Sequence, residues 1–254
     1  MTNLRVLGSS DWLPVQGNDC SSYIIGEHLL VDTGWAAPTR LLLQGFDLQQ
    51  LTTVLFTHMH TDHIMGLPQL LMNWRIMRGN MQGLTIAGPC EMVRAAVEAA
   101  SAYVFDGDAH APFTEGLNLV ELQPHDTLET DEFGILCMPS LHALPGRCYR
   151  IISKKDGHAV GLTGDTAYQS EYADFFMDVD LLVHEHSWHT KPMPEVNKAG
   201  HSNAAIAGRV ARESHARRLA LTHSRGDIDA SIALAQTECD CPITRLWNGN
   251  VVQF

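Results

Sequence analysis

The stretch at residues 51–63, LTTVLFTHMHTDH, constrains the fold of this chain more than any other. Its first half is short, uncharged and largely apolar, which predicts a β-strand buried inside a sheet. Its second half places three histidines and an aspartate within six residues, at His58, His60, Asp62 and His63. A strand that runs directly into this sequence presents four potential metal ligands on one tight turn.

Neutral imidazole and carboxylate groups are suitable ligands for divalent transition metals such as zinc. Four ligands so close in sequence cannot all reach one ion comfortably, but they can serve two ions ~3.5–4 Å apart. Each ion then needs further ligands. His142, Asp165 and His223 each follow an apolar run, and open α/β sheets place their sites at such strand ends. A carboxylate such as Asp165 can bridge two ions, while His142 and His223 complete one each.

Strand-like and helix-like segments alternate along the whole chain, and no Pro/Ser-rich linker divides it. This pattern predicts one α/β domain over residues 1–254, with sheet in the middle and helices outside. The expected strands are 4–9, a hairpin over 20–34, 51–58, 84–89, 134–144, 148–153, 158–166, 179–188, 217–224 and 245–254. The expected helices are 39–46, 67–79, 91–105, 202–216 and 230–238.

The chain is acidic, with a formal net charge of −12 and a pI near 5.5. General nucleic-acid binding is therefore disfavoured, because it requires a basic surface. The apolar runs fall far short of the ~20 residues of a membrane span, and residues 1–14 do not resemble a signal peptide. Six irregularly spaced cysteines predict reduced thiols in a cytoplasmic protein. The pair Cys239 and Cys241 is weak evidence for a second metal site.

With these features together, the chain resembles the metallo-β-lactamase superfamily. The resemblance rests on LLVDTG at 29–34, the cluster at 58–63, His142, TGDT at 163–166 and LTH at 221–223. It implies a four-layer αββα sandwich that binds two divalent metal ions, with zinc favoured and manganese or iron also compatible.

The resemblance also implies a role for each ligand. One ion would be bound by His58, His60 and His142, and the other by Asp62, His63 and His223. Asp165 would bridge the two ions, and Asp32 would orient ligands from behind.

Two further segments resemble the phosphodiesterase branch that contains RNase Z. They are LLVHEHSW at 181–188 and GHSNAAIAGRVARES at 200–214, where Asn203 stands in place of a threonine. The resemblance gives His201 a role at the scissile phosphate, Glu185 a role in supporting it, and Asp62 a role in orienting the attacking water. The implied reaction is hydrolysis of a phosphodiester by water activated between the two ions.

Neighbouring branches fit less well. Flavo-diiron proteins typically have glutamate at the position of His60, and many true metallo-β-lactamases have cysteine at that of Asp165. The usual bacterial RNase Z has a long arm that grips tRNA, between its third histidine ligand and its bridging aspartate. Here the corresponding residues, His142 and Asp165, are only 23 positions apart. The sequence therefore predicts an armless relative that acts on a small phosphodiester or ester, with RNA disfavoured.

Three alternatives remain open. A lactonase or thioesterase would use the same metal centre on a carbonyl group. An RNA-processing enzyme would need an unusual way to hold its substrate, and a binding module would retain the metals without catalysis.

Other motifs are explained by structure rather than by function. We expect His184, His186 and His189 to be exposed or satisfied histidines. The arginines at 209, 212, 217 and 218 form a solvated, paired face. The helix at 67–79 packs in the core or in a homodimer interface.

Overall fold

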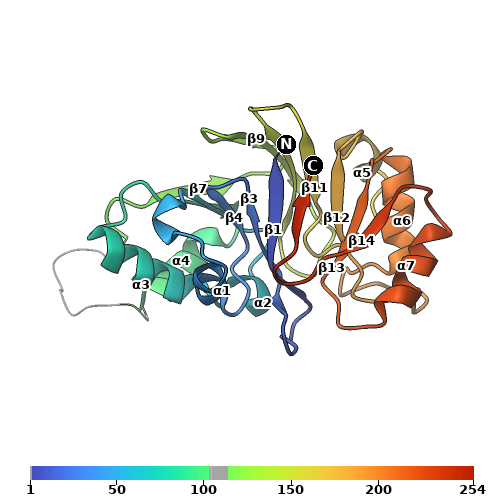
Figure 1. The fold of residues 1–254 in the computed structure, drawn as a ribbon, viewed down its shortest axis with the longest axis horizontal. Coiled ribbons are helices and arrows are strands. Elements are labelled where there is room, and N and C mark those ends of the chain that lie inside the picture. Colours follow the sequence, from blue (N-terminus) through green and yellow to red (C-terminus); the bar gives the residue numbers. More distant parts are fainter. Residues whose placement is uncertain (1, 103, 105–113) are drawn as a thin grey trace.

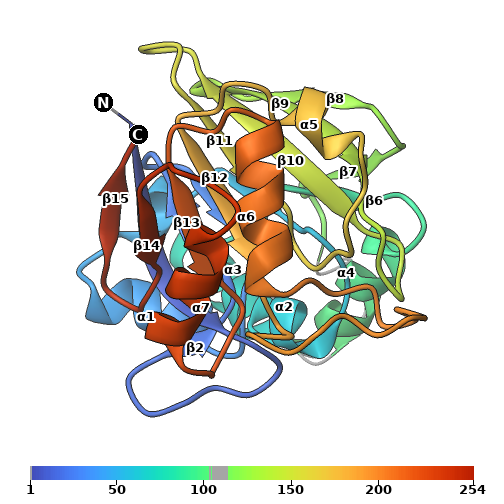
Figure 2. The same cartoon turned by 90° about the vertical axis from the view of Figure 1, so that its right-hand side faces the viewer.

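Two β-sheets lie face to face in the computed structural model, with helices on both outer sides (Figure 1). The structure describes residues 2–102, 104 and 114–254. The chain termini lie close together, because strand β1 near the N-terminus pairs with strand β15 near the C-terminus (Figures 1 and 2).

The first sheet has eight strands in the described part of the chain, ordered β15-β1-β3-β4-β5-β6-β7, with β2 paired to β1. Neighbours from β4 to β7 run parallel. The strands are β1 (Asn3–Ser10), β2 (Asp19–Cys20), β3 (Ser22–Ile25), β4 (Leu29–Val31), β5 (Thr53–Leu55), β6 (Thr85–Pro89), β7 (Asn118–Leu122) and β15 (Val251–Gln253).

The second sheet has seven strands within the described residues, ordered β14-β13-β12-β11-β10-β9-β8. Neighbours from β11 to β14 run parallel, and the remaining pairs are antiparallel. The strands are β8 (Thr127–Glu129), β9 (Phe133–Pro139), β10 (Arg147–Ser153), β11 (Ala159–Leu162), β12 (Leu181–Glu185), β13 (Leu219–Thr222) and β14 (Ile243–Arg245).

Helices cover the outer face of each sheet (Figures 1 and 2). On the first sheet lie α1 (Ala37–Leu43), the short 3₁₀ helix Leu48–Gln50, α2 (Thr61–Ile64), α3 (Leu67–Arg78) and α4 (Val93–Ala102). On the second lie α5 (Tyr172–Phe175), α6 (Ala204–Glu213) and α7 (Ile228–Gln236). None of the helices in the described residues is long and apolar enough to cross a membrane.

Three separate apolar layers hold the four structural layers together. Successive residues of a strand point to opposite faces of the sheet. Val54 of β5 accordingly packs under the helices, while its neighbour Leu55 packs between the two sheets. A third layer lies between the second sheet and α5, α6 and α7. The predicted αββα sandwich is confirmed, and the apolar run before the histidine cluster is explained by burial on both faces.

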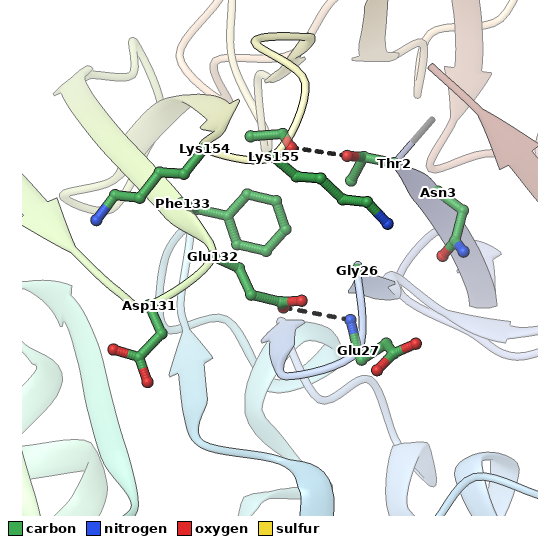
Figure 3. A pocket seen from close by; sticks show the side chains of 10 residues that line it. Thr2, Asn3, Gly26, Glu27, Asp131, Glu132, Phe133, Lys154 and Lys155 are labelled. Atoms are coloured by element: carbon green, nitrogen blue, oxygen red, sulfur yellow. Dashed lines mark hydrogen bonds between the residues drawn. The ribbon is translucent and has the colours of Figure 1, made fainter.

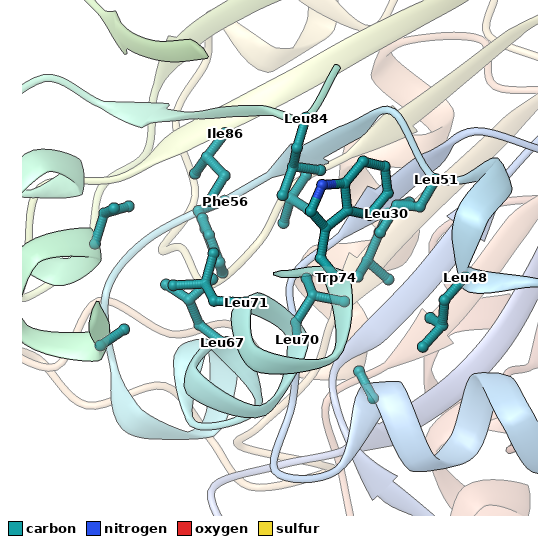
Figure 4. Packing of buried hydrophobic residues seen from close by; sticks show 14 of the residues in the cluster. Leu30, Leu48, Leu51, Phe56, Leu67, Leu70, Leu71, Trp74, Leu84 and Ile86 are labelled. Carbon is teal, nitrogen blue, oxygen red and sulfur yellow. The ribbon is translucent and has the colours of Figure 1, made fainter. Parts of the chain in front are cut away.

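In helix α3 the apolar residues that recur at helical spacing in the sequence are the residues that pack against the core. Leu67, Leu70, Leu71 and Trp74 repeat at helical spacing and are buried against the first sheet (Figure 4). The helix ends at Gly79, which adopts the left-handed conformation with φ of 79° that glycine tolerates best. The core alternative for this segment is therefore confirmed for these four residues.

Some predicted elements differ from the structure. The single strand expected over 245–254 is wrong: β14 belongs to the second sheet and β15 to the first. A turn separates them, with Gly249 at φ of 89° and a hydrogen bond from the Asn250 amide to the Trp247 carbonyl. Strands β7 and β8 and helix α5 were not predicted, because they are short or half-exposed. The expected helix at 91–105 is α4, and positions 103 and 105 lie outside the described residues.

The packing of α3 can be tested with two substitutions on one helix. Leu71→Ala should lower the free energy of unfolding by about 2–5 kcal/mol, because the side chain is fully buried and leaves a cavity. Ile76→Ala is the matched control and should change it by no more than about 0.5 kcal/mol, because Ile76 is 70% exposed. Urea denaturation measures both, and equal effects would contradict this packing.

Candidate metal centre

The site lies where the parallel strands of both sheets end. Asp32 follows β4, and residues 57–63 follow β5 in the first sheet. Asp165 follows β11, Glu185 ends β12, and His223 follows β13 in the second sheet. Because the carboxyl ends of parallel strands lie at one edge of a sheet, the direction of the strands alone brings these residues together.

One group of potential ligands contains three of the predicted histidines and the predicted bridging aspartate. His60 Nδ1 lies 3.0 Å from His58 Nε2 and 2.9 Å from His142 Nε2. Asp165 Oδ2 is 3.7 Å from His58 Nε2. Two nitrogens that bind one tetrahedral zinc at 2.0–2.1 Å stand about 3.3 Å apart, so this spacing is close to that of a metal site.

The second group shares Asp165 with the first. His63 Nε2 and His223 Nε2 are 3.3 Å apart, and Asp62 Oδ2 lies 3.1 Å from His223 Nε2. The Asp165 oxygens lie 3.5 Å from His63 Nε2 and 3.4 Å from His223 Nε2. All seven residues predicted as ligands therefore fall into two adjoining groups suited to binding metal ions.

The state of Asp165 tests whether these residues fit a cation. Its carboxylate is buried, and Oδ1 makes no hydrogen bond within the described structure. A buried carboxylate oxygen without a donor is costly. A cation between the two groups would satisfy it, so the donor set fits metal ions.

Asp32 orients the candidate ligands of the first sheet through hydrogen bonds on the side away from the cluster. Its Oδ1 accepts the Thr57 amide at 2.8 Å, and its Oδ2 accepts the Thr57 hydroxyl at 2.8 Å. Oδ2 also accepts His63 Nδ1–H at 2.8 Å, which leaves the lone pair of Nε2 directed into the cluster. Asp32 has φ of 54°, an unfavourable conformation for a residue other than glycine that the surrounding contacts maintain.

The second-sheet ligands are held in the same way. His142 Nδ1 donates to the Gly200 carbonyl at 2.9 Å, and His223 Nδ1 is 2.8 Å from the Ser187 hydroxyl. Gly200 has φ of 68°, and a Cβ there would lie 2.4 Å from the His142 Cα. Glycine is thus required for the chain to pass this close to the ligand.

Burial and charge set the protonation of the ligands. Burial lowers the pKa of His58, His60 and His142, and neighbouring imidazoles lower it further. These three are therefore neutral near pH 7, the form that can bind a metal. Burial acts in the same sense on His63, but the charges of Asp165 and Asp32 outweigh it and raise its pKa.

His201 and Glu185 form a pair beside the two groups. Glu185 is buried, and its Oε1 accepts His201 Nδ1–H at 2.9 Å and the amides of Thr166 and Ser202 at 3.1 Å. Its Oε2 accepts the Ser187 amide and hydroxyl at 2.8 Å. Glu185, His201 and His223 also form a third group whose atoms lie close enough to hold an ion. Both oxygens of Glu185 already accept hydrogen bonds, and this places Glu185 to orient His201.

The same pair controls the charge of His201. Burial alone would lower the pKa of His201, but the hydrogen bond and charge of Glu185 outweigh it and raise the pKa to about 9. The imidazolium is 22% exposed and lies 3.8 Å from Asp165 Oδ2. A positively charged donor therefore stands at the edge of the cluster.

A pocket of about 500 Å³ opens over this centre, within the usual size of small-molecule sites. It is lined by Asp11, Trp12, His60, Thr61, Asp62, Asp165, Ser187, Trp188, Lys191, His201 and His223. A second pocket of about 410 Å³ lies at the opposite edge of the sheets, around Gly26, Phe133 and Lys155 (Figure 3). It contains none of the predicted ligands.

The residues given plainer readings fall outside the two groups. His184 and His186 are buried rather than exposed, with Nδ1 bonded to a backbone carbonyl and Nε2 without a partner among the described residues. The Sγ atoms of Cys239 and Cys241 are 3.5 Å apart but belong to no group of three potential ligands in the described chain. Arg209, Arg212 and Arg217 pair with acidic residues on the surface, as expected.

Sequence reasoning missed several residues of the site. Thr57, Ser187 and Gly200 were not proposed, although each contacts a predicted ligand or its carboxylate partner. The pocket residues Trp12 and Lys191 were also missed. Nothing in their local sequence marks them, because they reach the site only through the tertiary fold.

A sandwich of two sheets with a histidine and aspartate centre at their carboxyl edge defines a metallo-hydrolase fold. The chain belongs to the beta-lactamase superfamily, because the sequence profile of the beta-lactamase superfamily domain matches residues 27–224.

Known relatives agree with this assignment. The chain is 29% identical over 229 residues to the probable metallo-hydrolase YhfI of Bacillus subtilis, covering 87% of this chain and 86% of the relative. It is 24% identical over 273 residues to a ribonuclease Z of Acaryochloris marina, covering 87% and 85%.

Solved structures share the fold over their full length. The crystal structure of Bacillus subtilis YhfI has a TM-score of 0.83 at 24% identity, covering 99% of this chain and 98% of that one. Human tRNase Z, short form, has a TM-score of 0.76 at 20% identity, with the same coverage.

The ligand geometry leads to a test of metal content. The purified protein should contain about two divalent ions per chain, because seven ligand-type residues are too many for one tetrahedral site. Elemental analysis measures this, and chelation should lower Tm because a bound ion stabilises the folded state. His60→Ala should lose metal, whereas His158→Ala, a surface control, should not. A single bound ion with Asp165 turned away would contradict the two-ion scheme.

Proposed function

We propose that this protein is a dinuclear metal-dependent phosphodiesterase that acts on small substrates. The observation that carries the proposal is the hydrogen bond between the buried Glu185 and the half-buried His201, which lines the pocket beside the ligand groups. A phosphodiester already carries a negative charge on its two non-bridging oxygens and gains more in the transition state, so a positively charged donor beside the ligand groups suits it better than a neutral carbonyl substrate. The ribonuclease Z relatives, whose name denotes cleavage of a phosphodiester, support the same choice.

The bound ions would supply Lewis acidity and an activated water of pKa about 7. The chain's own residues would perform the other tasks. Asp62 is held ionised, since burial raises its pKa but the His223 hydrogen bond and nearby imidazoles lower it to about 2. It can therefore accept a hydrogen bond from the attacking water and orient it.

His201 would act on the leaving group rather than on the attacking water. As water oxygen bonds to phosphorus, one phosphorus–oxygen ester bond breaks and the leaving oxygen takes up negative charge. Protonated His201 can donate its N–H to the phosphoryl oxygens and a proton to the leaving oxygen. Glu185 keeps the imidazole oriented and charged while this happens. A lactonase or thioesterase remains the second candidate, because it would use the same ligands.

The role of His201 is tested by separating catalysis from metal binding. His201→Ala should keep the fold and the metal content but lower kcat on a phosphodiester by about 10²–10⁴-fold, as for a lost general acid. KM should change little, because the main contribution of His201, protonation of the leaving oxygen, arises only in the transition state. Bis-p-nitrophenyl phosphate is a suitable substrate.

His158→Ala is the matched control. His158 also pairs with a carboxylate, Asp180, at 3.0 Å, but on the surface and away from the pocket. Its removal should leave kcat unchanged. Full phosphodiesterase activity in His201→Ala would contradict this role and favour a lactonase or thioesterase. Assays with a panel of lactones and thioesters would then identify the substrate.

Precursor tRNA should be a poor substrate. The segment between His142 and Asp165 is the short antiparallel hairpin of β10 and β11, joined over residues 154–158, and offers no arm to hold a large RNA. The net charge of −12 adds repulsion from the phosphate backbone. Efficient 3′ cleavage of precursor tRNA at physiological salt would contradict this, and a human or bacterial tRNase Z serves as the positive control.

A further inference from the structure

Two tryptophans line the pocket over the metal centre, although its other walls are polar. Trp12 comes from the segment between β1 and β2, and Trp188 from the segment after β12. Trp12 is 60% exposed. An exposed indole that lines the pocket over the candidate metal centre offers a large, rigid aromatic face to a bound ligand.

Trp12 is held in place rather than left free. The Arg225 guanidinium lies over its ring, 4.9 Å from the centroid. Arg225 Nε bonds Asp11 Oδ1 at 2.6 Å, and the same oxygen accepts the Leu13 amide at 3.3 Å. Arg225 is only two positions after the ligand His223. The indole is thus fixed relative to the metal centre before any substrate arrives, which reduces the entropy lost on binding.

Trp188 and Lys191 are fixed to the residues that precede α6. The Trp188 amide donates to the Ser202 carbonyl at 3.0 Å, and the Asn203 side chain donates to the Lys191 carbonyl at 2.9 Å. Asn203 also accepts the Ile206 amide and caps α6. The asparagine that replaces threonine at this position therefore anchors the segment that carries both pocket residues.

The charge of Lys191 adds a second requirement. No ion pair between the described residues includes the Lys191 ammonium group, in a chain with far more acidic than basic groups. An unpaired cation beside two indole rings suits a ligand that is both aromatic and anionic.

We infer that Trp12 and Trp188 stack a planar base of the substrate, so that the substrate is a phosphodiester of a single nucleoside. This inference rests on the proposed function, and it names the substrate class. A volume of about 500 Å³ is large enough to hold a mononucleotide. Base–aromatic stacking tolerates different bases, because every base offers a π-face.

The test compares substrates that differ only in the base. Adenosine 3′,5′- and 2′,3′-cyclic phosphates are compared with the methyl riboside cyclic phosphates that lack a base, and ring opening is followed by phosphorus NMR. Wild-type kcat/KM should favour the base-bearing substrate. Trp12→Ala should reduce this preference by about 5- to 150-fold, the range expected for one lost stacking contact. Trp12→Phe should retain most of it.

Trp35→Ala is the control, because Trp35 is also exposed but does not line the pocket. It should leave the preference intact. Calorimetry with adenosine 5′-monophosphate against ribose 5-phosphate gives a second measure that needs no turnover, and it applies equally to Trp188→Ala.

The outcomes separate the two proposals. Equal hydrolysis of base-bearing and base-free cyclic phosphates, or a preference that survives in Trp12→Ala and Trp188→Ala, would overturn the inference and leave the phosphodiesterase proposal standing. Hydrolysis of lactones or thioesters with no phosphodiester cleaved would overturn both.

Discussion

The buried carboxylate of Asp165 is the group on which the rest of the site depends. It lies within 4 Å of His58 and His63 from one sheet and of His223 and His201 from the other. A buried negative charge with an oxygen lacking a hydrogen-bond donor is tolerated only beside compensating positive charge. The six other ligand-type residues around it provide a place for that charge, and together with Asp165 they join the two sheets at one edge.

The sandwich positions these groups through the direction of its strands. Parallel strands in both sheets deliver polar residues to the same edge, while the apolar faces of those strands form the layers on either side. Rigid strand ends locate the ligands, and a set of hydrogen bonds from Asp32, Gly200 and Ser187 turns each ring to face inward. The strained backbone at Asp32 and His223 is maintained by the same contacts.

The superfamily uses one metal centre for several reactions, so the surroundings of the centre decide between them. In this chain the surroundings include a charged His201 hydrogen-bonded to Glu185, two indole rings, and Lys191, which forms no ion pair with a carboxylate in the described part of the chain. A single-nucleoside phosphodiester would use each of them, with the phosphoryl group at the ligands and the base on the rings.

The sequence by itself determined the class of fold, and it predicted the seven residues that the structure gathers into two groups suited to metal ions. The apolar run before His58 predicted a strand that is buried on both faces. The helical spacing of four apolar residues in α3 predicted a helix packed on the core. Histidines and aspartates at the ends of strands predicted the position of the site. These are local signals, because burial on a strand or helix depends on a period of a few residues.

Only the tertiary structure decided which distant residues share the pocket. Trp12 meets Arg225, and Glu185 meets His201, through the packing of separate elements. The C-terminal residues divide between two sheets for the same reason, since pairing with β1 or β13 is a choice that 245–254 do not encode alone. Contacts between residues so far apart in the chain depend on how both sheets pack, and no short pattern records that geometry.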